Sequence, residues 1–255
     1  MLFPTLVLLG LLTGALIGAT GVGAGALMTP VLLWGFHLPL PLAIGTDLCF
    51  AAITKFGGAV AHWRRGHVDR GIVAHMLLGS LPACLGTLLA MHALGWARAG
   101  RGVLGTALGV ALLLTAAMIA GRGRWSRFAL RAGRRVPAWA RDVLTVVLGA
   151  LLGVLVTLSS VGAGAIGSTL IVLLYPRLRA RRLVGTDIAH ALPLSLVASA
   201  GHAWLGHVDW RVLAALLLGS LPGIWLGARA SDWLPERITR ALLATLLLGI
   251  GLRML

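Results

Sequence analysis

The sequence carries one ordered series of short motifs twice. Each motif of the second half repeats one of the first half after 139 or 140 residues. The pairs are VGAGA at 22–26 and 161–165, GTD at 45–47 and 185–187, GHVD at 66–69 and 206–209, and LLGSLP at 77–82 and 217–222. Four blocks in the same order at nearly one offset indicate an internal duplication. Two halves of one fold, related by a pseudo-twofold axis, are therefore expected, with any working site at the contact between them.

The composition indicates a membrane protein. Hydrophobic residues make up 58% of the 255 residues and charged residues 11%, with a mean hydropathy of +0.95. A soluble domain carries about 25% charged residues to cover its surface, so we predict an all-α protein that crosses the membrane several times. The chain has room for about eight segments of ~20 residues. Residues 1–18 lack the basic start of a cleaved signal peptide, so they are expected to remain as the first segment.

The net charge of +15 does not indicate a nucleic-acid partner. The basic residues gather in short loops between apolar segments, as membrane orientation requires. Cys49 and Cys84 lie in apolar stretches without a CxxC pair, and the chain has no HExxH motif, no clustered Cys/His set and no paired carboxylates. We therefore expect no metal and no cofactor.

Hydropathy divides each repeat into a broken apolar region followed by three spans. The first repeat (1–120) has the region 4–36 and spans at 45–63, 71–93 and 102–120. The second (142–255) has the region 143–175 and spans at 185–205, 212–228 and 238–254. Between them lies a linker, 121–141, with seven arginines, which the positive-inside rule places in the cytoplasm.

The arginines also decide how region 143–175 meets the membrane. If it crosses once, the loop basic residues divide 12 inside to 9 outside; if it folds back as a hairpin, they divide 17 to 4. The hairpin fits the rule better. It also makes the two halves insert oppositely, as an inverted repeat. Segments 26–36 and 165–175, about 16 Å long as helices, are too short to cross ~30 Å of hydrocarbon, so we expect them to be re-entrant.

The Gly-Ala-Gly runs (23–25 and 162–164) at the tips of these hairpins are the first candidate site. Unwound backbone at membrane depth is tolerated only beside protein or a wet cavity, and the N-terminus of the helix that follows favours an anion. The alternative is that small residues merely let helices pack closely. The candidate substrate-binding residues are Thr20, Gly21, Gly23, Gly25, Thr29, Lys55, Ser159, Ser160, Gly162, Gly164, Ser168 and Thr169.

Three further residues are candidates for proton coupling. Asp47 and Asp187 each stand at the expected start of a span, where they either cap the helix or titrate near the mouth of a cavity. His190 is either a proton carrier or a core histidine with its hydrogen bonds satisfied. Lys55, the only lysine, follows Asp47 by two helical turns; it either pairs with Asp47 or binds the charge of a substrate.

The other repeated motifs have structural interpretations. In each GHVD motif, Asp69 or Asp209 is expected to close a tight turn and cap the next helix. In each LLGSLP motif, the proline (Pro82 or Pro222) is expected to kink its helix.

Together these motifs resemble the sulfite exporter TauE/SafE family of membrane anion transporters. The resemblance covers residues 5–253 and is carried by the Gly-rich first helix of each half with Pro30, the Gly-Thr start of the second span, the GSLP run and the turn from Gly206 to Trp210. Arg70 departs from this pattern, since Trp210 stands at the equivalent place. The resemblance implies a duplicated helical bundle that transports sulfite, thiosulfate, a sulfonate or a related organic anion, driven by protons.

The sequence is thus interpreted as a proton-coupled anion permease of the bacterial inner membrane, with its site between the two hairpin tips. The expected partners are the lipid bilayer, a small anion and protons; the cargo, its direction and the oligomeric state stay open. Two alternatives remain. One is an intramembrane enzyme acting on an anionic lipid, for which only Thr20, Ser159 and Ser160 offer nucleophiles. The other is a passive anion channel.

Overall fold

The apolar segments form helices because a chain in lipid must satisfy its own backbone hydrogen bonds. The computed structural model describes residues 2–20, 25–96, 102–132, 137–230 and 236–254. Within these ranges the only regular elements are ten α-helices, and six of them are long and apolar enough to cross a membrane. This confirms the prediction of an all-α, multi-pass membrane protein.

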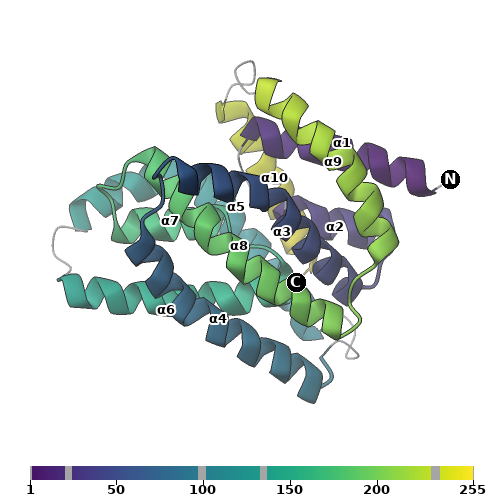
Figure 1. Ribbon diagram of the computed structural model, residues 1–255, viewed down its shortest axis with the longest axis horizontal. Coiled ribbons are helices and arrows are strands. Elements are labelled where there is room, and N and C mark those ends of the chain that lie inside the picture. Colours follow the sequence, from purple (N-terminus) through teal and green to yellow (C-terminus); the bar gives the residue numbers. More distant parts are fainter. Residues whose placement is uncertain (1, 21–24, 97–101, 133–136, 231–235, 255) are drawn as a thin grey trace.

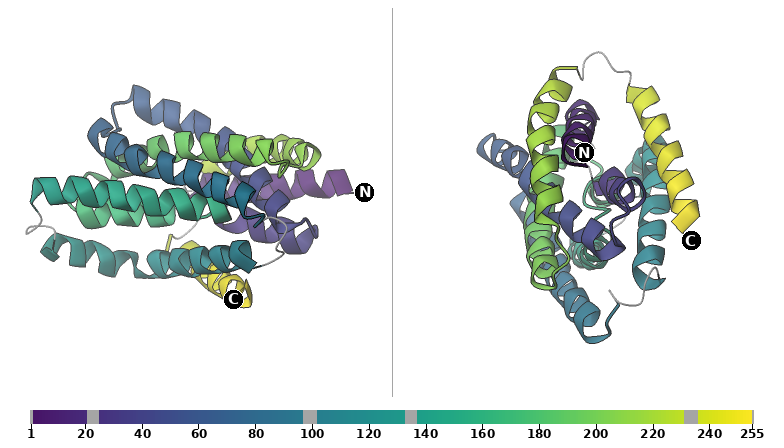
Figure 2. Two further views of the ribbon diagram at one scale, coloured as in Figure 1. Left: turned by 90° about the horizontal axis from the view of Figure 1, so that it is seen from below. Right: turned by 90° about the vertical axis from the view of Figure 1, so that its right-hand side faces the viewer.

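Each half contributes five helices in the same order. The first half contains α1 (Leu2–Thr20), α2 (Gly25–Gly35), α3 (Leu40–Arg64), α4 (Arg70–Ala93) and α5 (Gly102–Ala132). The second contains α6 (Ala138–Ser159), α7 (Ala165–Leu174), α8 (Ala180–Trp204), α9 (Trp210–Ala230) and α10 (Glu236–Met254). Most of these helices run along the long axis of the molecule (Figure 2).

Several boundaries differ from the predicted spans. Helices α3 and α8 begin five residues earlier than expected, at Leu40 and Ala180. Pro39 and Pro41 at the start of α3 suit the first turn of a helix, where a backbone N–H has no partner to lose. Helix α5 runs on to Ala132, well into the expected linker. Hydropathy marks where a helix leaves lipid and misses polar helical turns beyond that point.

The main helix contacts join one half to the other. Helix α1 packs along α9, and its counterpart α6 packs along α4 (Figure 1). The counterparts α3 and α8 pack on each other, as do α5 and α10. The two largest contacts between unlike helices, α1 with α9 and α6 with α4, are thus equivalent with the halves exchanged, which is the pattern of a self-complementary twofold interface.

Helices α3 and α8 run in opposite directions. Gly45, near the start of α3, lies against the His207 carbonyl just beyond the end of α8, and Gly185 lies in the same way against the His67 carbonyl. The Thr46 hydroxyl accepts a hydrogen bond from the Asp209 N–H at 3.0 Å, and the Thr186 hydroxyl accepts one from the Asp69 N–H at 3.0 Å. The start of each helix is thereby tied to the turn of the opposite half.

The turns themselves are closed as predicted. The Asp69 carboxylate accepts a hydrogen bond from the Ile72 N–H at 3.2 Å and caps α4. The Asp209 carboxylate accepts bonds from the N–H groups of Arg211 and Val212 at 3.0 and 3.1 Å. The predicted capping role of both aspartates is confirmed.

Glycines bring the paired helices into backbone contact. A Cβ atom added at Gly79 of α4 would overlap the Val146 carbonyl of α6, and one at Gly219 of α9 would overlap the Val7 carbonyl of α1. The same holds from the other side of each pair, at Gly149 and Gly10. Lipid offers little hydrophobic force between helices, so close packing of small residues carries much of their association.

This packing can be tested on one helix. We expect Gly79→Ala to destabilise the protein by about 1–3 kcal/mol, as overpacking does, and to lower the midpoint of thermal unfolding in detergent. Gly86→Ala is the matched control, because Gly86 lies on the same helix with nothing within 4 Å of an added Cβ. It should leave stability unchanged or raise it by up to ~1 kcal/mol through helix propensity. Equal midpoints for the two variants would contradict the role of Gly79.

Candidate functional site

Two buried aspartates face the short helices α2 and α7. Asp47 on α3 is fully buried, and Asp187 on α8 is 7% exposed. The Asp47 Oδ2 atom accepts a hydrogen bond from the Thr29 hydroxyl of α2 at 2.5 Å. The Asp187 Oδ1 atom lies against Gly167 of α7, where an added Cβ would overlap it. Each carboxylate therefore contacts the short helix of its own half.

Neither aspartate caps its helix. Because α3 begins at Leu40 and α8 at Ala180, Asp47 and Asp187 lie in the third helical turn, and the capping interpretation of the two GTD motifs is wrong. The Oδ1 atoms of both residues are buried and have no hydrogen-bond partner within the described part of the chain. A buried carboxylate without full hydrogen bonding is costly, so these positions are not explained by helix formation.

Lys55 lies between the two acids. It follows Asp47 by eight residues, about 12 Å along α3, and the contacts of Gly45 with His207 and of Gly185 with His67 place its backbone midway between the depths of Asp47 and Asp187. Its strongest electrostatic partner is Asp187, with Asp47 second. Its counterpart in the other half is Ser195, whose buried hydroxyl has no partner among the described residues.

His190 joins this group from α8. Its Nε2 atom lies 3.0 Å from the Ser80 hydroxyl of α4, its Nδ1 atom is buried without a partner among the described residues, and its ring is within electrostatic range of Lys55. Phe50 occupies the equivalent position in the first half and is fully buried. The two halves thus hold different chemistry: His190 follows Asp187 where Phe50 follows Asp47, and the counterpart of Lys55 is a serine.

The break between α6 and α7 brings the second half to Asp47. Ser160 ends α6 in the left-handed conformation, with φ of 60°, and Gly162 follows with φ of 121°. The Gly162 carbonyl accepts hydrogen bonds from the N–H groups of Gly164 and Gly167 at 2.8 and 3.0 Å. The Ser160 hydroxyl lies near the Asp47 carboxylate and makes no hydrogen bond of standard geometry to a described residue.

Most of the predicted hydroxyl donors are already engaged. Thr29 donates to Asp47, Ser159 donates to the Leu155 carbonyl at 2.5 Å, and Ser168 and Thr169 donate to the Ala165 carbonyl at 3.3 and 2.7 Å. Among the described candidates, this leaves the Ser160 hydroxyl without a hydrogen bond of standard geometry, while the Lys55 ammonium has Asp187 and Asp47 as electrostatic partners. Gly21 and Gly23 lie outside the described residues, as do the side chain of Thr20 and the surroundings of Gly25.

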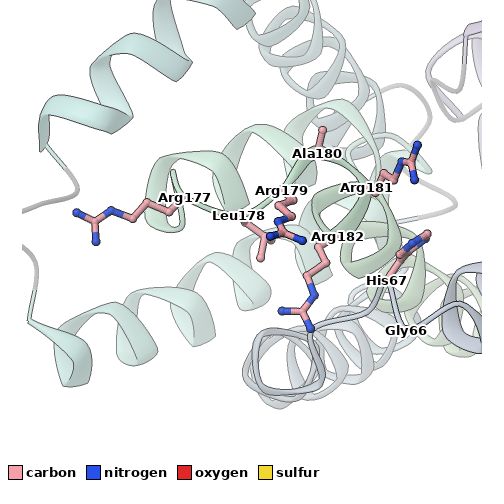
Figure 3. Close-up of a pocket in the computed structure, with 8 residues that line it drawn as sticks. All are labelled: Gly66, His67, Arg177, Leu178, Arg179, Ala180, Arg181 and Arg182. Carbon is pink, nitrogen blue, oxygen red and sulfur yellow. The ribbon is translucent and has the colours of Figure 1, made fainter.

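An arginine-rich hollow opens at the start of α8. It has a volume of about 910 Å³ and is lined by Gly66, His67 and residues 177–182 (Figure 3). Arg182 is five residues before Asp187, about 7.5 Å along the helix. The hollow therefore lies at the end of the molecule closest to the Asp187 side of the polar group.

Comparison with known proteins now decides the class of protein. The family model for the sulfite exporter TauE/SafE matches residues 6–254. The chain belongs to the TauE/SafE family. It is 34% identical over 254 residues to the probable membrane transporter protein YjnA of Bacillus subtilis, covering 98% of this chain and 99% of that one. It is 26% identical over 246 residues to the probable membrane transporter protein YdhB of the same organism, covering 92% and 93%. No solved structure matches the chain significantly.

The family settles one of the alternatives. TauE/SafE proteins are membrane transporters, and both full-length relatives are described as transporters. The protein is therefore a multi-pass membrane transporter and not an intramembrane enzyme.

Ser80 is the site residue of this TauE/SafE protein that sequence reasoning missed. The LLGSLP motif suggested a kinked helix, but the Ser80 hydroxyl contacts His190 and its backbone lies against Gly153 of α6. A hydroxyl repeated at mid-span was the available signal, because an uncharged polar group at that depth usually has a partner on another helix.

The Thr29–Asp47 hydrogen bond offers a direct test of the site. Thr29→Val removes the donor and leaves a buried carboxylate oxygen without a partner, so we expect a loss of about 1–3 kcal/mol in stability. Thr29→Ser should restore most of it. The matched control is Thr169→Val, whose hydroxyl bonds only to its own helix and whose loss should shift the unfolding midpoint little. A Thr29→Val protein as stable as Thr169→Val would contradict the bond.

Proposed function

We propose that this protein is a secondary transporter of a small sulfur-containing or organic anion, such as sulfite, thiosulfate or a sulfonate. The anion binds near the bilayer midplane, between the two Gly-rich helix breaks, and its movement is coupled to protons. The membrane is the bacterial inner membrane, with residues 121–141 in the cytoplasm. The cargo class rests on the family, whose model is that of a sulfite exporter. The observation that carries the site is the single lysine between two buried aspartates where both repeats meet.

Lys55 is the anchor for the anion in this proposal. It is the only lysine of the chain, and a cation inside a span is expensive unless it is paired or bound to a ligand. Ser160 supplies a free hydroxyl beside Asp47, and the N-terminus of α7 adds a favourable dipole. The hydroxyls of Thr29, Ser159, Ser168 and Thr169 donate hydrogen bonds within the protein in this conformation. They therefore shape the site without donating to the anion.

Charge balance argues for proton coupling. Two carboxylates and one ammonium already carry an excess negative charge, and an anion would add a second one in a medium of low dielectric constant. A proton that enters with the anion cancels the charge that the anion adds. Asp187 is the better acceptor, because it competes with the anion for Lys55 and its Oδ1 atom, packed against Gly167, has no hydrogen-bond partner among the described residues. Asp47 is instead held by Thr29.

The arrangement of the arginines supports opposite insertion of the two repeats. Residues 177–182 line the same hollow as Gly66 and His67, so the two segments belong at one end of the molecule. Helices α4 and α5 each cross once between the turn at Gly66 and the linker, so that turn lies on the side of the linker, in the cytoplasm. Region 143–175 then starts and ends on the cytoplasmic side, as a hairpin does. Alternating access follows from rocking of one half against the other around the shared site.

The proposal predicts saturable, proton-dependent uptake by proteoliposomes. Labelled sulfite, thiosulfate, sulfoacetate and simple carboxylates are offered with an imposed pH gradient, and at least one is expected to accumulate. Lys55→Gln should reduce that uptake by about tenfold to a hundredfold, the range expected for one charge-assisted contact. Arg253→Gln, which removes a charge near Trp34 instead, is the control. Undiminished uptake by Lys55→Gln would refute the anchor, and non-saturable flux would favour a channel.

The two aspartates are expected to differ in coupling. Asp187→Asn removes the proton acceptor beside Lys55, so the remaining uptake should no longer respond to the pH gradient. Asp47→Asn keeps an acceptor for the Thr29 hydroxyl and should keep the response to pH. The measurement is initial uptake over a series of external pH values at fixed membrane potential. Loss of the pH response in Asp47→Asn alone would reverse the assignment.

A further inference from the structure

We propose that the arginine-rich hollow at the start of α8 is a binding site for a phosphate-class oxyanion. The site is formed by residues 177–182 together with Gly66 and His67 from the turn between α3 and α4. It is distinct from the transport site, and it does not depend on the identity of the cargo.

The hollow concentrates positive charge without a counter-charge. None of the eight described residues that line it is acidic, and four of them are arginines: Arg177, Arg179, Arg181 and Arg182. All four are exposed. Figure 3 shows Arg177 and Arg181 pointing in opposite directions at the two ends of the segment, with Arg179 and Arg182 between them. Like charges on neighbouring residues repel each other, and a bound anion relieves that repulsion.

The N-terminus of α8 opens into the same space. The helix begins at Ala180, and Arg179 occupies the cap position without a side-chain hydrogen bond to the first turn. Both residues line the hollow. Uncapped N–H groups and the positive end of the helix dipole favour an oxyanion there, and the forked guanidinium groups match its oxygen geometry.

The duplication shows that the fold does not require these arginines. The equivalent segment of the first half, 37–42, reads His-Leu-Pro-Leu-Pro-Leu and starts α3 without any arginine. Their absence from the first copy fits the proposed opposite insertion of the two repeats, which places residues 177–182 at the cytoplasmic end. Orientation accounts for their positive charge, and the hollow and the uncapped start of α8 around which they gather point to a ligand.

The position of the hollow suggests two sources for the oxyanion. Trp63, half exposed at the end of α3, stacks with Arg70 at 5.1 Å beside the same turn, and exposed tryptophans mark the headgroup level of a membrane. The oxyanion is then the headgroup of an anionic phospholipid, or a free oxyanion drawn from solution. Both present the same chemistry to the arginines.

The test uses the full-length protein and a charge-matched control. The variant Arg179→Gln/Arg181→Gln/Arg182→Gln is compared with Arg211→Gln/Arg229→Gln/Arg253→Gln, which loses the same charge away from the hollow. Calorimetry in phosphatidylcholine nanodiscs measures binding of inorganic phosphate, and native mass spectrometry counts phosphatidylglycerol retained from mixed lipids. Thermal unfolding checks that each variant is folded, and the single variants Arg179→Gln and Arg182→Gln replace the triple variant if it is not.

We expect the hollow variant to weaken phosphate affinity, phosphatidylglycerol retention or both by about tenfold or more, as loss of charge-assisted bonds does. The control should stay within about twofold, because distant charges are screened in physiological salt. An effect on phosphate alone identifies a free oxyanion, and an effect on phosphatidylglycerol alone identifies a lipid headgroup. The proposal is overturned if the wild-type protein binds neither, or if both triple variants lose binding equally.

Discussion

The whole architecture depends on backbone contact between helices of opposite repeats. Along α1 and α9, and again along α4 and α6, glycines stand where any side chain would strike the partner's main chain. In lipid this close contact replaces the hydrophobic force that holds soluble helices together. It also means that neither repeat can bury its first helix alone, because α1 needs α9 and α6 needs α4. The break that follows α6 is therefore held in the interior by contacts of α6 with the other half.

Contacts between the two halves also position the residues of the polar site. Because Thr46 and Thr186 each bind the turn of the opposite half, α3 and α8 are held antiparallel in a fixed register. That register places Lys55 of α3 and its counterpart Ser195 of α8 at the same depth, midway between the two aspartates. The framework is symmetric, but at this position only α3 carries a cation. In the proposed mechanism this cation gives the anion a single preferred place to bind.

The helical architecture was easier to predict from the sequence than the site. The duplication and composition were enough for an all-helical, two-repeat membrane protein, and Asp69 and Asp209 were correctly expected as caps, because capping depends on neighbours a few residues away. The GTD motifs were wrongly expected to cap their helices, because the partners of their aspartates lie on other helices. Hydropathy treats a polar residue as the end of a span, whereas Asp47 and Asp187 lie within their helices and face α2 and α7. Ser80 was missed likewise, since its partner His190 is 110 residues away.

The departures from symmetry are more informative about function than the symmetry itself. Positions shared by both copies, such as the glycine contacts and the threonine–turn bonds, explain how the halves fit together. Lys55, His190 and Gly167 have the unlike counterparts Ser195, Phe50 and Met28, and the arginines of 177–182 have no basic equivalent beyond His37. His190 and the arginines belong to α8 or to the segment that leads into it, and Lys55 and Gly167 both interact with Asp187 of the same helix. The differences thus gather around the first half of α8. Duplication by itself supplies two equivalent sides. The proposed binding of one anion and one proton therefore requires such differences on one side of the axis.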